Sequence, residues 1–92
     1  MINIRIKIIA FTACAWEDYL YWFRQDKNVL KRINRLIKEI QRATYAGIGK
    51  PEALKFELAG LWSRRIDREH RLVYQIEGDK LIVFQCRYHY DP

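Results

Sequence analysis

A β-hairpin is predicted by the stretch RLVYQIEGDKLIVFQCRYHY, which spans residues 71–90. Its two strand-like segments, residues 71–77 and 81–90, are rich in β-branched and aromatic residues and flank Gly78-Asp79, a dipeptide typical of two-residue hairpin turns. Side chains alternate between the two faces of a strand. We therefore expect one face of the hairpin to lie in the core, beneath the helices that precede it: Leu72, Tyr74, Ile76, Ile82, Phe84, Cys86 and Tyr88.

Two amphipathic helices are predicted upstream of the hairpin. The first follows a candidate N-cap at Thr12, and the second follows a candidate N-cap at Asp26. Apolar residues of the second helix recur at helical spacing along one face: Val29, Leu30, Ile33, Leu36, Ile37 and Ile40. Because the join between the helices is short, we expect an antiparallel pair. The basic face of the second helix fits either a solvated surface or a direct RNA contact.

Three further segments complete the predicted fold. Residues 2–8 alternate Ile with polar residues, which is typical of a half-buried strand, and residues 61–67 are also strand-like. Pro51 fits the first position of a short helical turn over residues 52–55, after a loop that contains Gly47 and Gly49. Together these elements predict an α+β fold in a single domain that spans residues 1–92.

The composition favours a polyanionic partner and a globular protein. Seventeen Lys and Arg residues against eleven Asp and Glu residues give a net charge of +6, although charge alone also fits solubility. Cys14 and Cys86 have no CxxC spacing, so we expect two buried thiols rather than a zinc site or a disulfide. No secretory signal or membrane-spanning run is apparent, and we expect a cytoplasmic protein without a membrane partner.

The second face of the predicted sheet is polar and basic. It collects Arg71, Val73, Gln75, Val83, Gln85, Arg87 and His89, together with Ser63 and Arg65 of the preceding strand. In a two-layer fold such a face is ordinarily just the solvated side. The alternative is a phosphodiester site, because arginines on neighbouring strands repel one another unless an anion lies among them.

Four residues near this polar face supply the groups that metal-independent RNA cleavage needs. The reaction requires a base for the 2′-hydroxyl, cations for the charge that develops on phosphorus, and an acid for the departing 5′-oxygen. Glu52, Arg65, Arg71 and His89 include one group of each kind. The set is not specific, because any small basic protein contains these residue types, and a single His in a strand also fits a structural role.

Five motifs resemble the Txe/YoeB toxins in both order and spacing. They are WEDYLYW (residues 16–22), GIGKPEALK (47–55), GLWSRRI (60–66), EHRLVY (69–74) and CRYHY (86–90). The resemblance implies a RelE/ParE-like fold, with two N-terminal helices packed on a curved, mainly antiparallel sheet of four to five strands. It also implies an endoribonuclease that cuts messenger RNA in the aminoacyl site of the ribosome, inhibits translation and is neutralised by a cognate antitoxin. Whether the toxin forms a homodimer is left open.

The resemblance implies roles for the residues that match the family motifs. Glu52 corresponds to the general base and His89 to the general acid. Arg71 and Arg65 correspond to the cations that stabilise the phosphate, Arg71 as part of the catalytic set and Arg65 in substrate binding. No metal and no other cofactor are expected.

Three further residues are expected to bind substrate. Lys55 matches an auxiliary cation of the family and Tyr90 a substrate-positioning residue, while Arg87 belongs to the polar face. Strand alternation puts Tyr90 on the core face beside Tyr88, so a role in substrate binding requires the chain end to curl out of the strand. Pro92 is compatible with such a departure because proline cannot extend a sheet ladder.

Two other functions fit parts of the pattern. One is a toxin of the same superfamily that poisons a DNA topoisomerase without cutting RNA, since a fold does not fix a function. Such an inhibitor has no chemical need for Glu52, Arg71 and His89. The other is a nucleic-acid-binding module without catalysis, for which the net charge and a basic sheet suffice.

Overall fold

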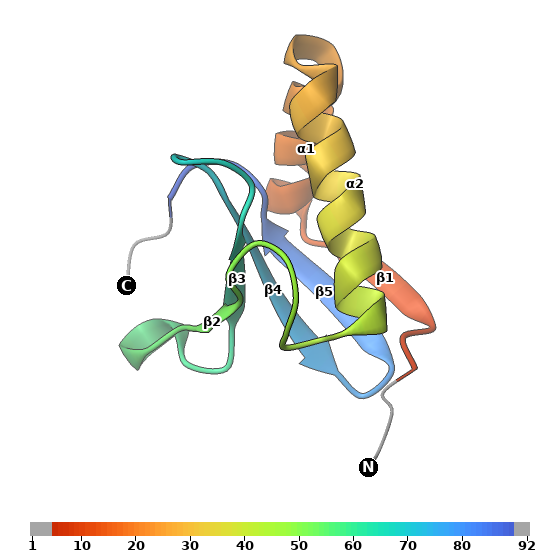
Figure 1. The fold of residues 1–92 in the computed structure, drawn as a ribbon, viewed down its shortest axis with the longest axis vertical. Coiled ribbons are helices and arrows are strands. Elements are labelled where there is room, and N and C mark those ends of the chain that lie inside the picture. The colour runs from red at the N-terminus through yellow and green to blue at the C-terminus, as the bar shows by residue number, and fades with distance from the viewer. Residues whose placement is uncertain (1–4, 90–92) are drawn as a thin grey trace.

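Two helices form an antiparallel pair in the computed structural model, which describes residues 5–89 (Figure 1). They are α1 (Ala13–Gln25) and α2 (Lys27–Arg42). The Thr12 hydroxyl accepts a hydrogen bond from the Ala15 N–H at 3.1 Å, and the Asp26 carboxylate accepts bonds from the N–H groups of Asn28 and Val29 at 3.0 and 3.3 Å. Both predicted N-caps are thus confirmed.

Within the described part of the chain, five strands form one mixed sheet in the order β1-β5-β4-β3-β2. Their bounds are Ile8–Phe11 (β1), Glu52–Ala53 (β2), Trp62–Arg65 (β3), Arg71–Glu77 (β4) and Lys80–Gln85 (β5), and a 3₁₀ helix η1 (Phe56–Leu58) follows β2. β1 is parallel to β5, and the other neighbouring strands are antiparallel. The predicted two-residue turn is confirmed, because Glu77 pairs with Lys80. The predicted α+β class, with two helices on a mainly antiparallel sheet, is also confirmed.

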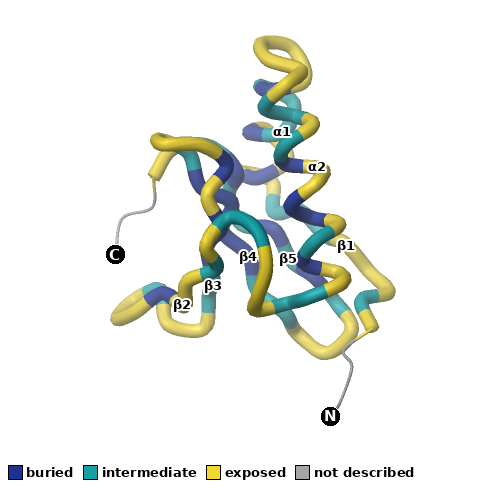
Figure 2. The backbone as a smooth tube through the Cα atoms, in the orientation of Figure 1, coloured by how far each residue is buried: buried dark blue, intermediate teal, exposed yellow. Residues whose placement is uncertain are grey.

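The core lies between the helices and one face of the sheet (Figure 2). Its fully buried apolar residues include Ile33, Leu36 and Ile40 of α2 and Leu72, Tyr74, Leu81 and Val83 of the sheet. Burying each large apolar side chain stabilises the fold by about 1.5–3 kcal/mol. No helix within residues 5–89 has the length and apolar character that a membrane span requires.

The core face of β5 differs from our prediction. Leu81 and Val83 are fully buried, whereas Ile82, which we assigned to the core face, is only half-buried. The turn explains this result, because a two-residue loop pairs Ile76 with Leu81 and Tyr74 with Val83. Paired residues lie on the same face of the sheet. Because Tyr74 and Ile76 are on the core face of β4, their partners Val83 and Leu81 are on the core face of β5.

A β-bulge reverses the alternation at the end of β5. The pairing shifts next to Val73, which faces Gln85, so that Phe84 is the extra residue and is half-buried rather than in the core. The shift returns Cys86 to the core, where it is fully buried as predicted. Tyr88, which we also assigned to the core, is 54% exposed because it lies beyond the end of the strand.

The first strand begins later than predicted. We expected it over residues 2–8, but β1 starts at Ile8, and residues 1–4 lie outside the described part of the chain. Its partner β5 starts only at Lys80, which pairs with Ile8. The N–H groups of Lys7 and Ile8 both donate to the Asp79 carbonyl, so the chain reaches the hairpin turn at Lys7 and has no strand residue of β5 to pair with before Ile8.

Two other predicted boundaries also need correction. The last strand was expected to continue to residue 90, but β5 ends at Gln85. Residues 52–55 were expected to form a helical turn, but Glu52 and Ala53 form β2 by pairing with Ser63 and Trp62. Tertiary pairing with β3 therefore overrides the local helical signal after Pro51.

Candidate active site

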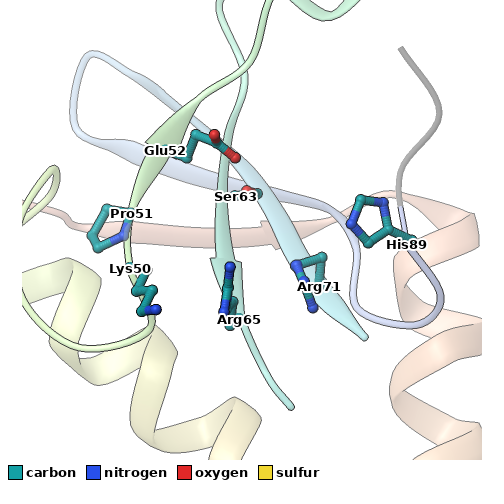
Figure 3. A pocket seen from close by; sticks show the side chains of 7 residues that line it. All are labelled: Lys50, Pro51, Glu52, Ser63, Arg65, Arg71 and His89. Atoms are coloured by element: carbon teal, nitrogen blue, oxygen red, sulfur yellow. The ribbon is translucent and has the colours of Figure 1, made fainter. Parts of the chain in front are cut away.

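A pocket of about 320 Å³ lies on the polar face of the sheet (Figure 3). It is lined by Lys50, Pro51, Glu52, Ser63, Arg65, Arg71 and His89. The structure therefore brings together four of the residues that the sequence singled out for RNA cleavage: Glu52, Arg65, Arg71 and His89. They come from three strands and from the segment that follows β5.

The register of the sheet determines how these side chains are arranged. Glu52 pairs with Ser63, and Arg65 pairs with Arg71, so β2, β3 and β4 each contribute to one surface. Neighbouring strands are separated by about 4.8 Å. Glu52 and His89 lie on different sides of the pocket, with Ser63 and Arg71 between them (Figure 3). An anion in the middle is thus within reach of groups from both sides.

Arg71 is a cation that is largely removed from solvent. The residue is only 8% exposed, and its Nη1 donates to the carbonyl oxygens of Asp67 at 2.9 Å and His70 at 3.1 Å. These carbonyls orient the guanidinium, and low solvent exposure strengthens its interaction with an anion. Its pairing with Arg65 places two like charges opposite each other, an arrangement that an anion between them would stabilise.

Buried Arg64 organises the loop that leads to Glu52. The residue is fully buried, and its guanidinium donates to the carbonyls of Ala43, Ala46 and Ile48 at 2.6, 2.8 and 3.0 Å. Its Nε also donates to the Tyr74 hydroxyl at 3.2 Å. Arg64 thus joins the residues after α2 to the centre of the sheet.

Gly49 brings the same loop against β3. Its φ is +85°, a conformation that side chains disfavour, and an added Cβ would lie 2.9 Å from Leu36 and 3.0 Å from Arg64. The Gly49 carbonyl accepts a hydrogen bond from the Arg65 N–H at 2.6 Å. This close contact fixes the position of Lys50 and the residues after it beside the pocket.

We predict that Arg64→Ala lowers the free energy of unfolding by about 3 kcal/mol or more, because it leaves three partly buried carbonyls without this donor and opens a cavity where the buried side chain was. Arg35→Ala is the matched control, since Arg35 is exposed on α2, and should change stability by less than about 0.5 kcal/mol. Urea unfolding followed by tryptophan fluorescence measures both. Equal midpoints for the two variants would contradict a structural role for Arg64.

The segment that carries His89 is held by groups that sequence reasoning missed. Trp22 Nε1 donates to the Cys86 carbonyl at 2.8 Å, and the Asp18 carboxylate accepts from the Cys86 N–H at 3.1 Å. His70 Nδ1 accepts from the Tyr88 N–H at 2.7 Å. Asp18 and Trp22 lie within the first motif and His70 within the fourth, but no local pattern links them to the chain end.

Two titratable groups at this anchor are affected by burial. Burial raises the pKa of Asp18, against the lowering effect of the Cys86 N–H. Burial, with a further contribution from the Asp18 charge, raises the pKa of the Cys86 thiol to about 12. Cys86 is therefore a neutral core thiol at ordinary pH and not a nucleophile.

Two other predicted site residues, Lys55 and Arg87, are described by the structure but do not line the pocket. Lys55 is exposed at the start of η1, and the Arg87 guanidinium lies 3.4 Å from the ring centroid of Tyr21 on α1. Tyr90 lies outside the described residues. Their roles in substrate binding remain predictions.

Comparison with solved structures defines the class of protein. A YoeB/ParE toxin from Agrobacterium tumefaciens superposes with a TM-score of 0.89 and 46% identity, over 91% of this chain and 100% of that one. A YoeB dimer and a heterotetrameric YoeB–YefM toxin–antitoxin complex, both from Staphylococcus aureus, superpose with TM-scores of 0.86 and 0.85, at 47% identity over 94% of this chain and 99% of theirs. The fold is that of the RelE/ParE-like toxins.

The family follows from the sequence comparisons. Residues 11–90 match the family model for the YoeB-like toxin of bacterial type II toxin–antitoxin systems. Toxin YoeB of Streptomyces coelicolor is 56% identical over 82 residues, which are 89% of this chain and 98% of that protein. The chain belongs to the YoeB-like toxins, and the resemblance found in the sequence is confirmed.

Proposed function

We propose that this toxin is a ribosome-dependent endoribonuclease that cleaves messenger RNA and so inhibits translation. The observation that carries the proposal is the lining of one pocket by Glu52, Arg65, Arg71 and His89. A carboxylate, two guanidinium groups and an imidazole around one space are the groups that transesterification at a phosphodiester requires. The roles are those of base for Glu52, acid for His89 and phosphate-stabilising cations for the two arginines.

The charge of the protein supports the choice of substrate. The net charge of +6 favours association with RNA, and the pocket itself contains Lys50 beside the two arginines. So small a pocket cannot orient a long RNA by itself. In the proposed mechanism the ribosome provides this orientation, because it holds the messenger in a fixed conformation beside the toxin. The reacting 2′-oxygen and phosphate are then oriented before the toxin acts.

Purified toxin added to ribosomes programmed with a defined messenger tests the proposal. We expect a discrete cut within the codon in the aminoacyl site, mapped by primer extension, and much slower cutting of the same messenger without ribosomes. Intact messenger on ribosomes would contradict the proposal. If growth still stopped in that case, the topoisomerase-poison alternative would gain support.

We further propose that a cognate antitoxin binds over the pocket with an acidic segment. The complex of the Staphylococcus aureus relative supports an antitoxin partner, and the basic lining supports an acidic ligand by charge complementarity. A segment that is disordered when free can cover this surface and become ordered on binding. The dimer of that relative supports self-association as a second assembly of this toxin.

Antitoxin binding is expected to protect the amides of β2, β3 and the residues that precede β4 from hydrogen exchange. Arg65→Glu should slow association and weaken its salt dependence, whereas Arg24→Glu, an exposed change in the last turn of α1, should alter both much less. Stopped-flow binding at several ionic strengths measures these effects. Protection restricted to α1 and α2 would rule out direct masking of the pocket.

A further inference from the structure

The residue before His89 has an unusual backbone conformation. Tyr88 has a φ of +67°, in the left-handed region that residues with a side chain seldom adopt. Three hydrogen bonds hold its peptide groups in this conformation. Its N–H donates to His70 Nδ1 at 2.7 Å, and its carbonyl accepts from the Arg71 N–H at 3.0 Å and from Gln85 Nε2 at 3.1 Å. The turn changes the direction of the chain immediately before His89.

His70 is itself firmly held where it meets this turn. Its side chain is only 12% exposed, and its ring packs edge-on against Trp22 with 4.8 Å between centroids. Its backbone N–H donates to the Asp67 carboxylate at 2.7 Å, and its carbonyl accepts from Arg71 Nη1 at 3.1 Å. A single residue thus contacts both the guanidinium of Arg71 and the backbone next to His89.

The direction of the hydrogen bond fixes the chemical form of the His70 ring. A backbone N–H can only donate, so Nδ1 must be an unprotonated acceptor and the neutral ring must carry its proton on Nε2. Nε2 lies 3.6 Å from the Glu69 carboxylate, which suits that tautomer. His70 does not line the pocket, so its effect on the reaction must pass through other residues.

We propose that His70 is a positioning residue whose Nδ1 holds the left-handed turn at Tyr88 and thereby directs the His89 imidazole into the pocket. The expected effect of His70 on the cleavage rate rests on the proposed function. The structural part, that His70 orders residues 87–89, stands by itself. An error of about 1 Å in the position of a reacting group can cost about a hundredfold in rate.

Two substitutions at His70 separate the acceptor from the bulk of the ring. His70→Phe keeps an aromatic ring against Trp22 but has no acceptor, whereas His70→Asn offers an amide oxygen near the position of Nδ1. In single-turnover cleavage of programmed ribosomes at saturating toxin, we expect His70→Phe to be about tenfold to a hundredfold slower than the unmodified toxin. His70→Asn should recover most of this loss, and affinity for the ribosome should change little in either variant. Equal rates for His70→Phe and the unmodified toxin, or no recovery in His70→Asn, would overturn the inference.

A second pair of variants tests the turn if substitution of His70 impairs folding. Tyr88→Gly and Tyr88→Val both remove the aromatic ring, but only glycine adopts a positive φ without strain. Tyr88→Val should therefore cleave at least about tenfold more slowly than Tyr88→Gly. Similar rates for the two variants would show that the left-handed turn does not matter for the reaction.

Nuclear magnetic resonance distinguishes failure of this inference from failure of the proposed function. The ¹⁵N shifts of His70 should show an acceptor-type Nδ1, and ¹⁵N relaxation should show residues 87–89 more mobile in His70→Phe than in the unmodified toxin. If the unmodified toxin cuts no RNA, the proposed function fails. The ¹⁵N relaxation measurement then tests by itself whether His70 orders residues 87–89. If residues 87–89 are as well ordered in His70→Phe as in the unmodified toxin, the inference that His70 holds the turn at Tyr88 is wrong.

Discussion

The His89→Ala variant is expected to cleave messenger RNA on the ribosome at least about a hundredfold more slowly than the unmodified toxin. In the proposed mechanism His89 protonates the 5′-oxygen as it leaves, and alanine has no proton to give. Because His89 is exposed and follows the last strand, its loss should leave the fold intact. Single-turnover cleavage at saturating toxin measures the chemical step, and thermal unfolding verifies that the variant is folded.

Replacement of the other groups in the pocket extends the same prediction. Glu52→Ala should cost a similar factor, because it removes the base, and Arg71→Ala should be at least as damaging, because it leaves charge on the phosphorane uncompensated. Arg71→Lys should recover only part of the rate, since an ammonium cannot donate the paired hydrogen bonds of a guanidinium. Cys14→Ser is the control, because Cys14 does not line the pocket and is exposed on α1, which shows that our prediction of two buried thiols was wrong for Cys14 and correct only for Cys86. Near-normal rates for folded Glu52→Ala and His89→Ala would remove the acid–base assignment and leave catalysis by cations alone.

Local signals in the sequence predicted the framework of this fold. Thr12 and Asp26 act as N-caps because their side chains satisfy backbone N–H groups within three residues, and Gly78-Asp79 forms its turn within four residues. The turn was also sufficient to predict which face of β5 lies in the core, because a two-residue loop requires that Ile76 and Leu81 pair. We instead assigned that face from the alternation within each segment alone, and the assignment was wrong.

Non-local contacts determine what the sequence did not predict. β2 exists because Glu52 and Ala53 pair with β3, and the bulge at Phe84 appears only when β5 is matched to β4. The chain leaves the strand after Gln85 because α1 and His70 bind the backbone of Cys86 and Tyr88, contacts that join residues more than fifteen positions apart. No periodicity within a segment can reveal such partners.

In the candidate site, too, local patterns predicted some residue positions and non-local contacts determined others. Arg65 and Arg71 lie on strands whose register follows from their own patterns, so their shared face could be predicted. Arg87 was assigned to that face by extending β5 past its end, and it instead lies against Tyr21. We placed His89 on the polar face by continuing the alternation of the strand. It does line the pocket, but because it follows the turn at Tyr88 and not because the strand continues to it. Strand alternation is reliable only as far as the ladder of hydrogen bonds continues.

A single 2′-deoxy substitution in the messenger is expected to have the largest effect of all. If the nucleotide immediately upstream of the scissile phosphate lacks its 2′-hydroxyl, cutting at that bond should fall below detection. The reason is that the described lining of the pocket combines a single carboxylate, that of Glu52, with Lys50, Arg65 and Arg71, a set suited to hold a phosphate rather than to bind and activate a separate nucleophile. In RNA the neighbouring 2′-oxygen is already tethered beside phosphorus, which supplies the nucleophile at a very high effective concentration.

The proton transfers then follow from the two sides of the pocket. Glu52 removes the 2′-hydroxyl proton as the oxygen attacks phosphorus, the guanidinium groups stabilise the phosphorane, and the P–O5′ bond breaks as His89 protonates the departing oxygen. The products are a 2′,3′-cyclic phosphate and a 5′-hydroxyl end. Ribosomes programmed with messengers that differ only in this 2′-group provide the assay, at the magnesium concentration that the ribosome needs, and a deoxy substitution one codon downstream is the control. A 5′-phosphate product, or efficient cutting at the substituted position, would overturn this mechanism while leaving the membership of the toxin family untouched.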